Sequence, residues 1–194
     1  MAQGSTIKRY QLLVIGGSAG SLDGILQLLP AVKKLTSLAI VLVLHRRNGE
    51  SILAHLLSER TSWPVKEVEE KEPIVAGTIY IAPADYHLLI EKDKTFSLDY
   101  SEKVHYSRPA IDVTFESAAE AYGESLVAVL LSGANADGTD GLRQVKAAGG
   151  YTIVQDPAEA VVAYMPQHAI ENNTIDKVAS VILMAEIIQQ QMQL

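Results

Sequence analysis

Residues 10–21 have the sequence YQLLVIGGSAGS, an apolar run that ends in glycines and serines. A continuous apolar run closed by glycines is typical of a parallel strand that is buried on both faces. The next segment, residues 22–29, carries apolar side chains at the spacing of an amphipathic helix. We therefore predict a strand, a tight glycine-rich loop and a helix at the start of the chain.

Strands and helices alternate along the rest of the sequence. We expect further strands at residues 39–44, 65–68, 126–131 and 151–155, and helices at residues 51–60, 112–122, 141–148 and 176–191. Residues 78–83, 87–91 and 95–100 are expected to be strands of a local antiparallel insertion of hairpin type. The pattern predicts an α/β fold with a doubly wound, mostly parallel sheet flanked by helices. We expect one domain over residues 1–194, with residues 1–9 as a tail.

Composition excludes several classes of protein. The 194 residues include no cysteine, which rules out cysteine nucleophiles, disulfides and thiolate metal sites. The formal net charge of -7 argues against a nucleic-acid or anionic-membrane partner, because both need a basic surface. The longest apolar run, residues 38–44, is far shorter than the roughly 18 residues of a membrane span, and residues 1–9 lack the apolar core of a signal peptide. We expect a cytoplasmic protein without membrane insertion.

Ligands and substrates of such sheets bind at the carboxyl ends of the strands. The loops to search are therefore Gly16–Ser21, His45–Gly49, Ser132–Gly141 and Gln155–Pro166. The first loop fits either phosphate binding by backbone N–H groups or a nucleophilic serine on a tight turn. Its glycines at 16, 17 and 20 do not match the dinucleotide-binding spacing, and Ser18 or Ser21 could instead cap the following helix.

A serine nucleophile needs a base, and the base needs a carboxylate that orients it. His45 follows the second apolar strand and is the best candidate for the base, with His168 as the second choice. Asp137 and Asp140 are both candidates for the carboxylate, and either could be a turn or capping residue instead. Ser18, His45 and Asp137 each follow an apolar strand, so together they suggest a serine hydrolase.

Several motifs lie in order along nearly the whole chain: Val14–Gly20, His45, Gly77–Pro83 with His87-Leu88, Ser107–Asp112, Leu131–Gly138, Gln155–Pro157 and Met165-Pro166. In these motifs the sequence resembles the catalytic domain of the chemotaxis-type (CheB-like) protein-glutamate methylesterases. It differs at Ala134-Asn135, where the family typically has Met-Gly, and at Ala19, where threonine is common.

The resemblance implies that Ser18 is the nucleophile, His45 the general base and acid, and Asp137 the orienting carboxylate. Backbone N–H groups at Ala19 and Ala134 would form the oxyanion hole. The implied reaction hydrolyses γ-glutamyl methyl esters on methylated chemoreceptor helices and releases methanol, with deamidation of receptor glutamines as a related activity. No cofactor or metal is implied. Members of the family commonly carry an N-terminal receiver domain; we expect no receiver domain in residues 1–194 and a separate receiver protein as a regulator.

Two other function classes stay open on the sequence alone. One is a non-catalytic binding module that keeps the methylesterase fold, and the other is a nucleotide-binding domain that uses residues 16–21. Arg46, Arg47 and Arg108 could border a groove for an acidic receptor helix, or they could pair within the fold.

Overall fold

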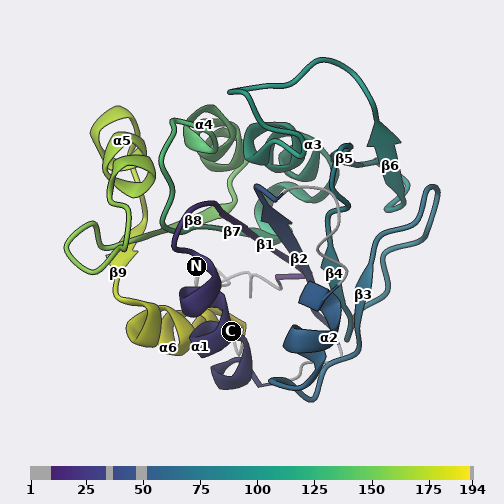
Figure 1. Ribbon diagram of the computed structural model, residues 1–194, viewed down its shortest axis with the longest axis horizontal. Helices are drawn as coiled ribbons and strands as arrows, with labels where there is room; N and C mark the ends of the chain where they lie inside the picture. The colour runs from purple at the N-terminus through teal and green to yellow at the C-terminus, as the bar shows by residue number, and fades with distance from the viewer. Residues whose placement is uncertain (1–9, 34–36, 47–51, 193–194) are drawn as a thin grey trace, which may run out of the picture.

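The computed structural model describes residues 10–33, 37–46 and 52–192 (Figure 1). The expected tail at residues 1–9, Arg47 and the first residue of the helix expected at 51–60 lie outside the described residues. The strands are β1 (Leu12–Gly17), β2 (Ala39–Leu44), β3 (Val65–Glu67), β4 (Ile79–Ile81), β5 (His87–Ile90), β6 (Phe96–Asp99), β7 (Leu126–Leu130), β8 (Tyr151–Gln155) and β9 (Lys177–Ala179). The helices are α1 (Leu22–Ala31), α2 (Ile52–Ser58), α3 (Ile111–Tyr122), the short 3₁₀ turn η1 (Gly123–Ser125), α4 (Thr139–Ala147), α5 (Tyr164–Asn172) and α6 (Val181–Met192).

Seven strands form one parallel sheet in the order β3-β4-β2-β1-β7-β8-β9. The chain runs from β1 to β2 on one side and later returns to β7 on the other side of β1. The strand order therefore reverses at β1, and a crevice is expected outside the carboxyl ends of β1 and its two neighbours. This confirms the doubly wound α/β fold that the sequence predicts.

Apolar side chains on the two faces of the sheet form two separate cores. Leu13 and Ile15 of β1 belong to the core that α1, α2 and α6 cover, whereas Leu12 and Val14 belong to the core under α3, α4 and α5. Figure 1 shows these two helical layers on opposite sides of the sheet. Because successive side chains of a strand point to opposite faces, a strand covered on both sides must be apolar throughout, as β1 is.

Two of the predicted elements differ from the structure. Residues 79–81 were expected in the antiparallel insertion, but β4 pairs in parallel with β2 and β3, and only β5 and β6 form the antiparallel pair. The helix expected at 176–191 is also divided, because β9 extends the sheet edge beside β8 before α6 begins. At that boundary the Ser180 hydroxyl accepts a hydrogen bond from the backbone N–H of Leu183, as a helix-capping serine does.

The described chain carries no helix with both the length and the apolar character that crossing a bilayer requires.

Candidate functional site

Ser18 follows the last residue of β1 at the carboxyl edge of the sheet. Its backbone N–H donates to the carbonyl of Ser132, 2.9 Å away, which ties the glycine-rich loop to the end of β7. A Cβ atom on Gly17 would lie 2.6 Å from Cβ of Ser21, so this tight turn requires glycine. The Ser21 hydroxyl donates to the Ser18 carbonyl at 2.7 Å, and neither Ser18 nor Ser21 caps α1 with its side chain. The predicted capping role is therefore wrong.

His45 follows β2, which pairs with β1 so that Leu44 lies opposite Gly17. This register places the imidazole directly beside Ser18, with 3.1 Å between Nδ1 and the serine Oγ. The other ring nitrogen, Nε2, lies 2.7 Å from Oδ2 of Asp137. The side chain of His45 is only 10% exposed, and so it is held between these two partners with little access to water.

Asp137 lies in the loop between β7 and α4 and is fully buried. Its Oδ2 accepts bonds from His45 and from the N–H of Ile111, and its Oδ1 accepts bonds from the N–H groups of Asp112 and Gly138. Burial alone would raise the pKa of the Asp137 carboxyl, but the hydrogen bonds from His45, Asp112 and Ile111 outweigh it and lower the pKa.

An ionised Asp137 fixes the tautomer of His45. A carboxylate can only accept hydrogen bonds, so the proton of the neutral imidazole lies on Nε2 and the lone pair of Nδ1 faces Ser18. This is the protonation state in which a histidine can take a proton from a serine hydroxyl. Three residues from three different loops, predicted together from sequence, thus form one hydrogen-bonded chain.

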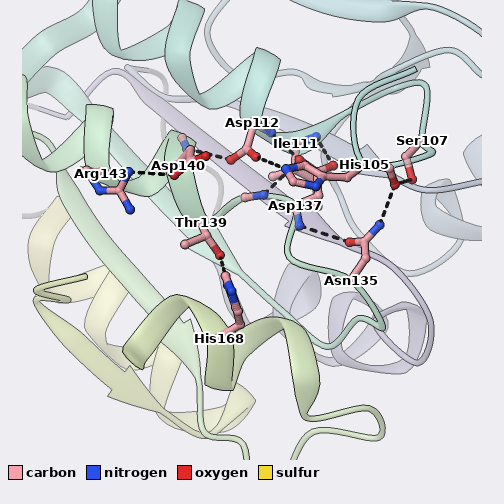
Figure 2. A network of polar contacts seen from close by, with 12 residues as sticks. His105, Ser107, Ile111, Asp112, Asn135, Asp137, Thr139, Asp140, Arg143 and His168 are labelled. Carbon is pink, nitrogen blue, oxygen red and sulfur yellow. Dashed lines mark hydrogen bonds and ion pairs between the residues drawn. The ribbon is translucent and has the colours of Figure 1, made fainter. Parts of the chain in front are cut away.

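Asp112 and His105 lie beside Asp137 (Figure 2). Nε2 of His105 is 3.2 Å from Oδ2 of Asp112, whose Oδ1 accepts a hydrogen bond from the N–H of Gly141. Burial and the neighbouring charge of Asp137 raise the pKa of Asp112 to about 7. Asp137 receives more hydrogen bonds than Asp112, so the negative charge of this carboxyl pair is stabilised on Asp137.

Ala19 directly follows Ser18, Ala134 lies in the loop after β7, and both residues are exposed. Within the described ranges, the backbone N–H of neither residue has a hydrogen-bond acceptor. The hydroxyl of Ser132, in the same loop as Ala134, donates to the carbonyl of Ala19 at 2.7 Å. The same hydroxyl accepts the N–H of Val162, in the loop before α5. Ser132 therefore helps to position these N–H groups, a role that sequence analysis missed.

The other predicted candidates lie in different surroundings. Asp140 is exposed and pairs with Arg143 at 2.7 Å, and His168 contacts Thr139 (Figure 2). His168 also stacks on the ring of Tyr164. Neither residue takes part in the chain formed by Ser18, His45 and Asp137.

A pocket of about 440 Å³ opens beside His45, lined by His45, Arg46, Asp85, Lys103, Tyr106, Ser107 and Arg108. Arg46 pairs with Glu67 at 2.9 Å, and Arg108 donates to the carbonyls of Tyr100 and Ser101 while its guanidinium stacks over the Tyr100 ring. Both arginines therefore border the pocket and also make contacts within the fold. Ser107, which the sequence analysis named only as the start of a family motif, also lies in this lining.

The ligand atoms of His105, Asp112 and Asp137 lie within 4.8 Å of one another, a spacing that a metal ion could use. Both oxygens of Asp137, however, already accept two hydrogen bonds each. We assign no metal to this cluster.

Comparisons with known proteins place this geometry in a family context. The family model described as CheB methylesterase matches residues 13–188. A protein of Leptospira interrogans named putative protein-glutamate methylesterase/protein-glutamine glutaminase is 45% identical over 181 residues, which cover 92% of this chain and 93% of that protein. A Thermotoga maritima protein-glutamate methylesterase/protein-glutamine glutaminase is 37% identical over 172 residues, and the match spans 50% of its length. The crystal structure of the Thermotoga maritima CheB methylesterase catalytic domain superposes with a TM-score of 0.88 at 35% identity, covering 93% of this chain and 98% of that one.

Proposed function

Because this chain belongs to the CheB methylesterase family, whose members are carboxylic ester hydrolases, we propose that Ser18, His45 and Asp137 are its catalytic triad. The observation that carries the proposal is the hydrogen-bonded chain from Ser18 Oγ through both ring nitrogens of His45 to buried Asp137. Such a chain turns a weakly nucleophilic hydroxyl into an attacking group, because the base and its orienting carboxylate are already in place.

The first half of the reaction forms an acyl-enzyme. Ser18 Oγ attacks the carbonyl carbon of a γ-glutamyl methyl ester while Nδ1 of His45 takes the hydroxyl proton. The N–H groups of Ala19 and Ala134 stabilise the negative oxygen of the tetrahedral intermediate. The bond between the carbonyl carbon and the methoxy oxygen then breaks, and the proton leaves Nδ1 with methanol.

The second half releases the product. His45 takes a proton from water, and the resulting hydroxide attacks the acyl carbon. The bond from that carbon to Ser18 Oγ then breaks as His45 returns the proton to the serine oxygen, which leaves a glutamate side chain and free Ser18. Throughout both halves, Asp137 stays ionised and stabilises the imidazolium. The same steps convert a glutamine side chain to glutamate with ammonia as the leaving group, which agrees with the second activity in the names of the Leptospira and Thermotoga relatives.

The substrate we propose is a methylated chemoreceptor in the cytoplasm. Support comes from the family and from the basic side chains of Arg46, Lys103 and Arg108 around the pocket beside His45. A rim of this charge favours a partner that carries acidic residues near its methyl ester, even though the whole chain has a net charge of -7. Control by a separate receiver protein stays a prediction.

Methanol release from a methylated chemoreceptor tests the proposal. We expect the wild-type protein to release methanol and Ser18→Ala to reduce the rate by several orders of magnitude. Ser58→Ala is the control, because its exposed hydroxyl bonds to the carbonyl of His55 within α2 and touches no residue of the proposed triad. Wild-type protein that releases no methanol, or an active Ser18→Ala, would refute the assignment and favour a non-catalytic module.

A further inference from the structure

Two serine hydroxyls, not one, contact the same nitrogen of the catalytic base. Ser107 Oγ lies 3.1 Å from Nδ1 of His45, the same distance as Ser18 Oγ. A neutral imidazole that carries its proton on Nε2 has a single lone pair at Nδ1, and so it can fully accept only one of these hydroxyls.

Ser107 has a second partner for its proton. Its hydroxyl can donate to the carbonyl of His105, 3.4 Å away, and that carbonyl also accepts the side-chain N–H of Asn135. When Ser18 donates to His45, Ser107 can therefore turn its proton to the carbonyl of His105, and once Nδ1 is protonated the Ser107 oxygen can accept its N–H. Because the Ser107 hydroxyl can either donate or accept a hydrogen bond, it can pair with Nδ1 of the neutral histidine or with the Nδ1–H of the protonated one.

The segment that carries Ser107 is fixed by its own contacts. The backbone groups of Val104 and Ser107 exchange two hydrogen bonds, and the neighbouring Arg108 binds the carbonyls of Tyr100 and Ser101. Ser107 also lines the pocket beside His45, whereas Ser18 is not part of that lining. The second hydroxyl thus lies on the side of the base that faces the pocket.

We propose that Ser107 is a positioning residue of the esterase reaction, whose hydroxyl accepts the Nδ1–H of the His45 imidazolium and directs that proton towards the leaving group. The proposal rests on the function assigned above. After Ser18 has attacked, a proton that stays directed at Ser18 Oγ favours the reverse reaction. A hydrogen bond to Ser107 draws the N–H away from that oxygen while the methoxy group is still attached.

The proton balance of this step is simple. The Ser18 O–H bond breaks and the Nδ1–H bond forms, and Ser107 then accepts the N–H while its own proton stays bound and points to His105. When the carbon–methoxy bond breaks, the Nδ1 proton is transferred to the methoxy oxygen and the hydrogen bond to Ser107 is released. Ser107 neither gains nor loses a proton over the cycle.

A comparison of two reactions at Ser18 tests this role. Methanol release requires protonation of a basic leaving group, whereas labelling by a fluorophosphonate releases fluoride, which needs little assistance. For Ser107→Ala we expect methanol release from a methylated chemoreceptor to fall about tenfold, as suits the loss of one hydrogen bond to a charged group. The labelling rate should stay within about twofold of wild type.

Three further variants sharpen the test. Ser107→Thr keeps the hydroxyl and should recover most of the methanol release, whereas Ser107→Cys, of nearly the same size, should behave like alanine. Ser101→Ala is the matched control, because its hydroxyl lies in the same segment but bonds only to Asp99. Equal losses in both reactions, or no loss of methanol release in Ser107→Ala, would overturn the proposal. Wild-type protein without methanol release would instead refute the methylesterase function itself.

Discussion

Replacement of Asp137 by asparagine changes one atom of a fully paired carboxylate. All four partners of Asp137 are N–H donors: Nε2 of His45 and the backbone of Ile111, Asp112 and Gly138. An amide keeps one oxygen and replaces the other with an NH₂ group, so two of these donors must face another donor. The consequence depends on which way the amide turns.

The two orientations differ in cost. With NH₂ towards Asp112 and Gly138, two backbone N–H groups lose their acceptor. With NH₂ towards His45 and Ile111, only the Ile111 N–H is left unpaired, because His45 can move its proton to Nδ1 and accept the amide at Nε2. Since each buried unpaired donor costs about 1–3 kcal/mol, the second orientation is favoured and the free energy of unfolding should fall by about 1–3 kcal/mol.

That orientation blocks the base. An Nδ1 that carries a proton cannot take one from Ser18, although the ring keeps its place. We expect kcat for methanol release to fall by about 10³–10⁴-fold, the scale of the same change in the trypsin template. Methanol release and urea unfolding measure the two effects separately.

Asp140→Asn is the control for Asp137→Asn, because Asp140 is exposed and its one ion pair among the described residues is with Arg143. We expect its kcat within about twofold and its unfolding free energy within about 0.5 kcal/mol of wild type. An Asp137→Asn protein that is folded and keeps a tenth or more of the wild-type kcat would refute the tautomer argument.

Two further predictions concern the support of the site. Gly16→Ala places a Cβ atom 2.4 Å from Cγ2 of Ile111, whose backbone N–H donates to Asp137. Urea unfolding should therefore show a free energy of unfolding about 1–3 kcal/mol below that of wild type. The control Gly24→Ala, whose new Cβ atom has its nearest contact at 3.4 Å, should show no decrease. Burial beside Asp137 raises the pKa of Asp112 from 3.8 to about 7, so its protonated form stabilises the fold below pH 4 and this contribution is lost as the pH rises through 7. For Asp112→Asn, the free energy of unfolding should therefore fall less between pH 4 and pH 8 than that of wild type, by up to about 4 kcal/mol. Equal decreases in the two proteins would contradict the assigned pKa.

The main sheet was predictable because its central strands are continuously apolar, and glycines lie at the carboxyl ends of β1 and β7. That pattern placed Ser18 and His45 on adjacent loops, and the register of β1 with β2 accounts for their contact. The short edge strand β9 was not predictable in the same way, because its three residues, Lys177–Ala179, carry no periodic signal and lie against an apolar helix sequence. Pairing with β8 determines its conformation, and this contact is not local in sequence.

The residues around the triad were harder to identify than the triad. Ser107, Asp112 and Ser132 are polar residues in sequences that suit a loop or a helix start, and nothing local distinguishes them from other serines and aspartates. Their roles arise from contacts over 25 or more positions, such as the N–H of Asp112 with Asp137. The aspartate in the motif Ser107–Asp112 was visible as part of the family resemblance, but its partner was not.

Mass spectrometry after reaction with a fluorophosphonate tests the central claim, that Ser18 is the nucleophile activated by His45. We predict one adduct per chain, located on Ser18, with its rate of formation reduced at least a hundredfold in His45→Ala. An adduct on Ser107 or on another serine, or no adduct on folded wild-type protein, would contradict the account.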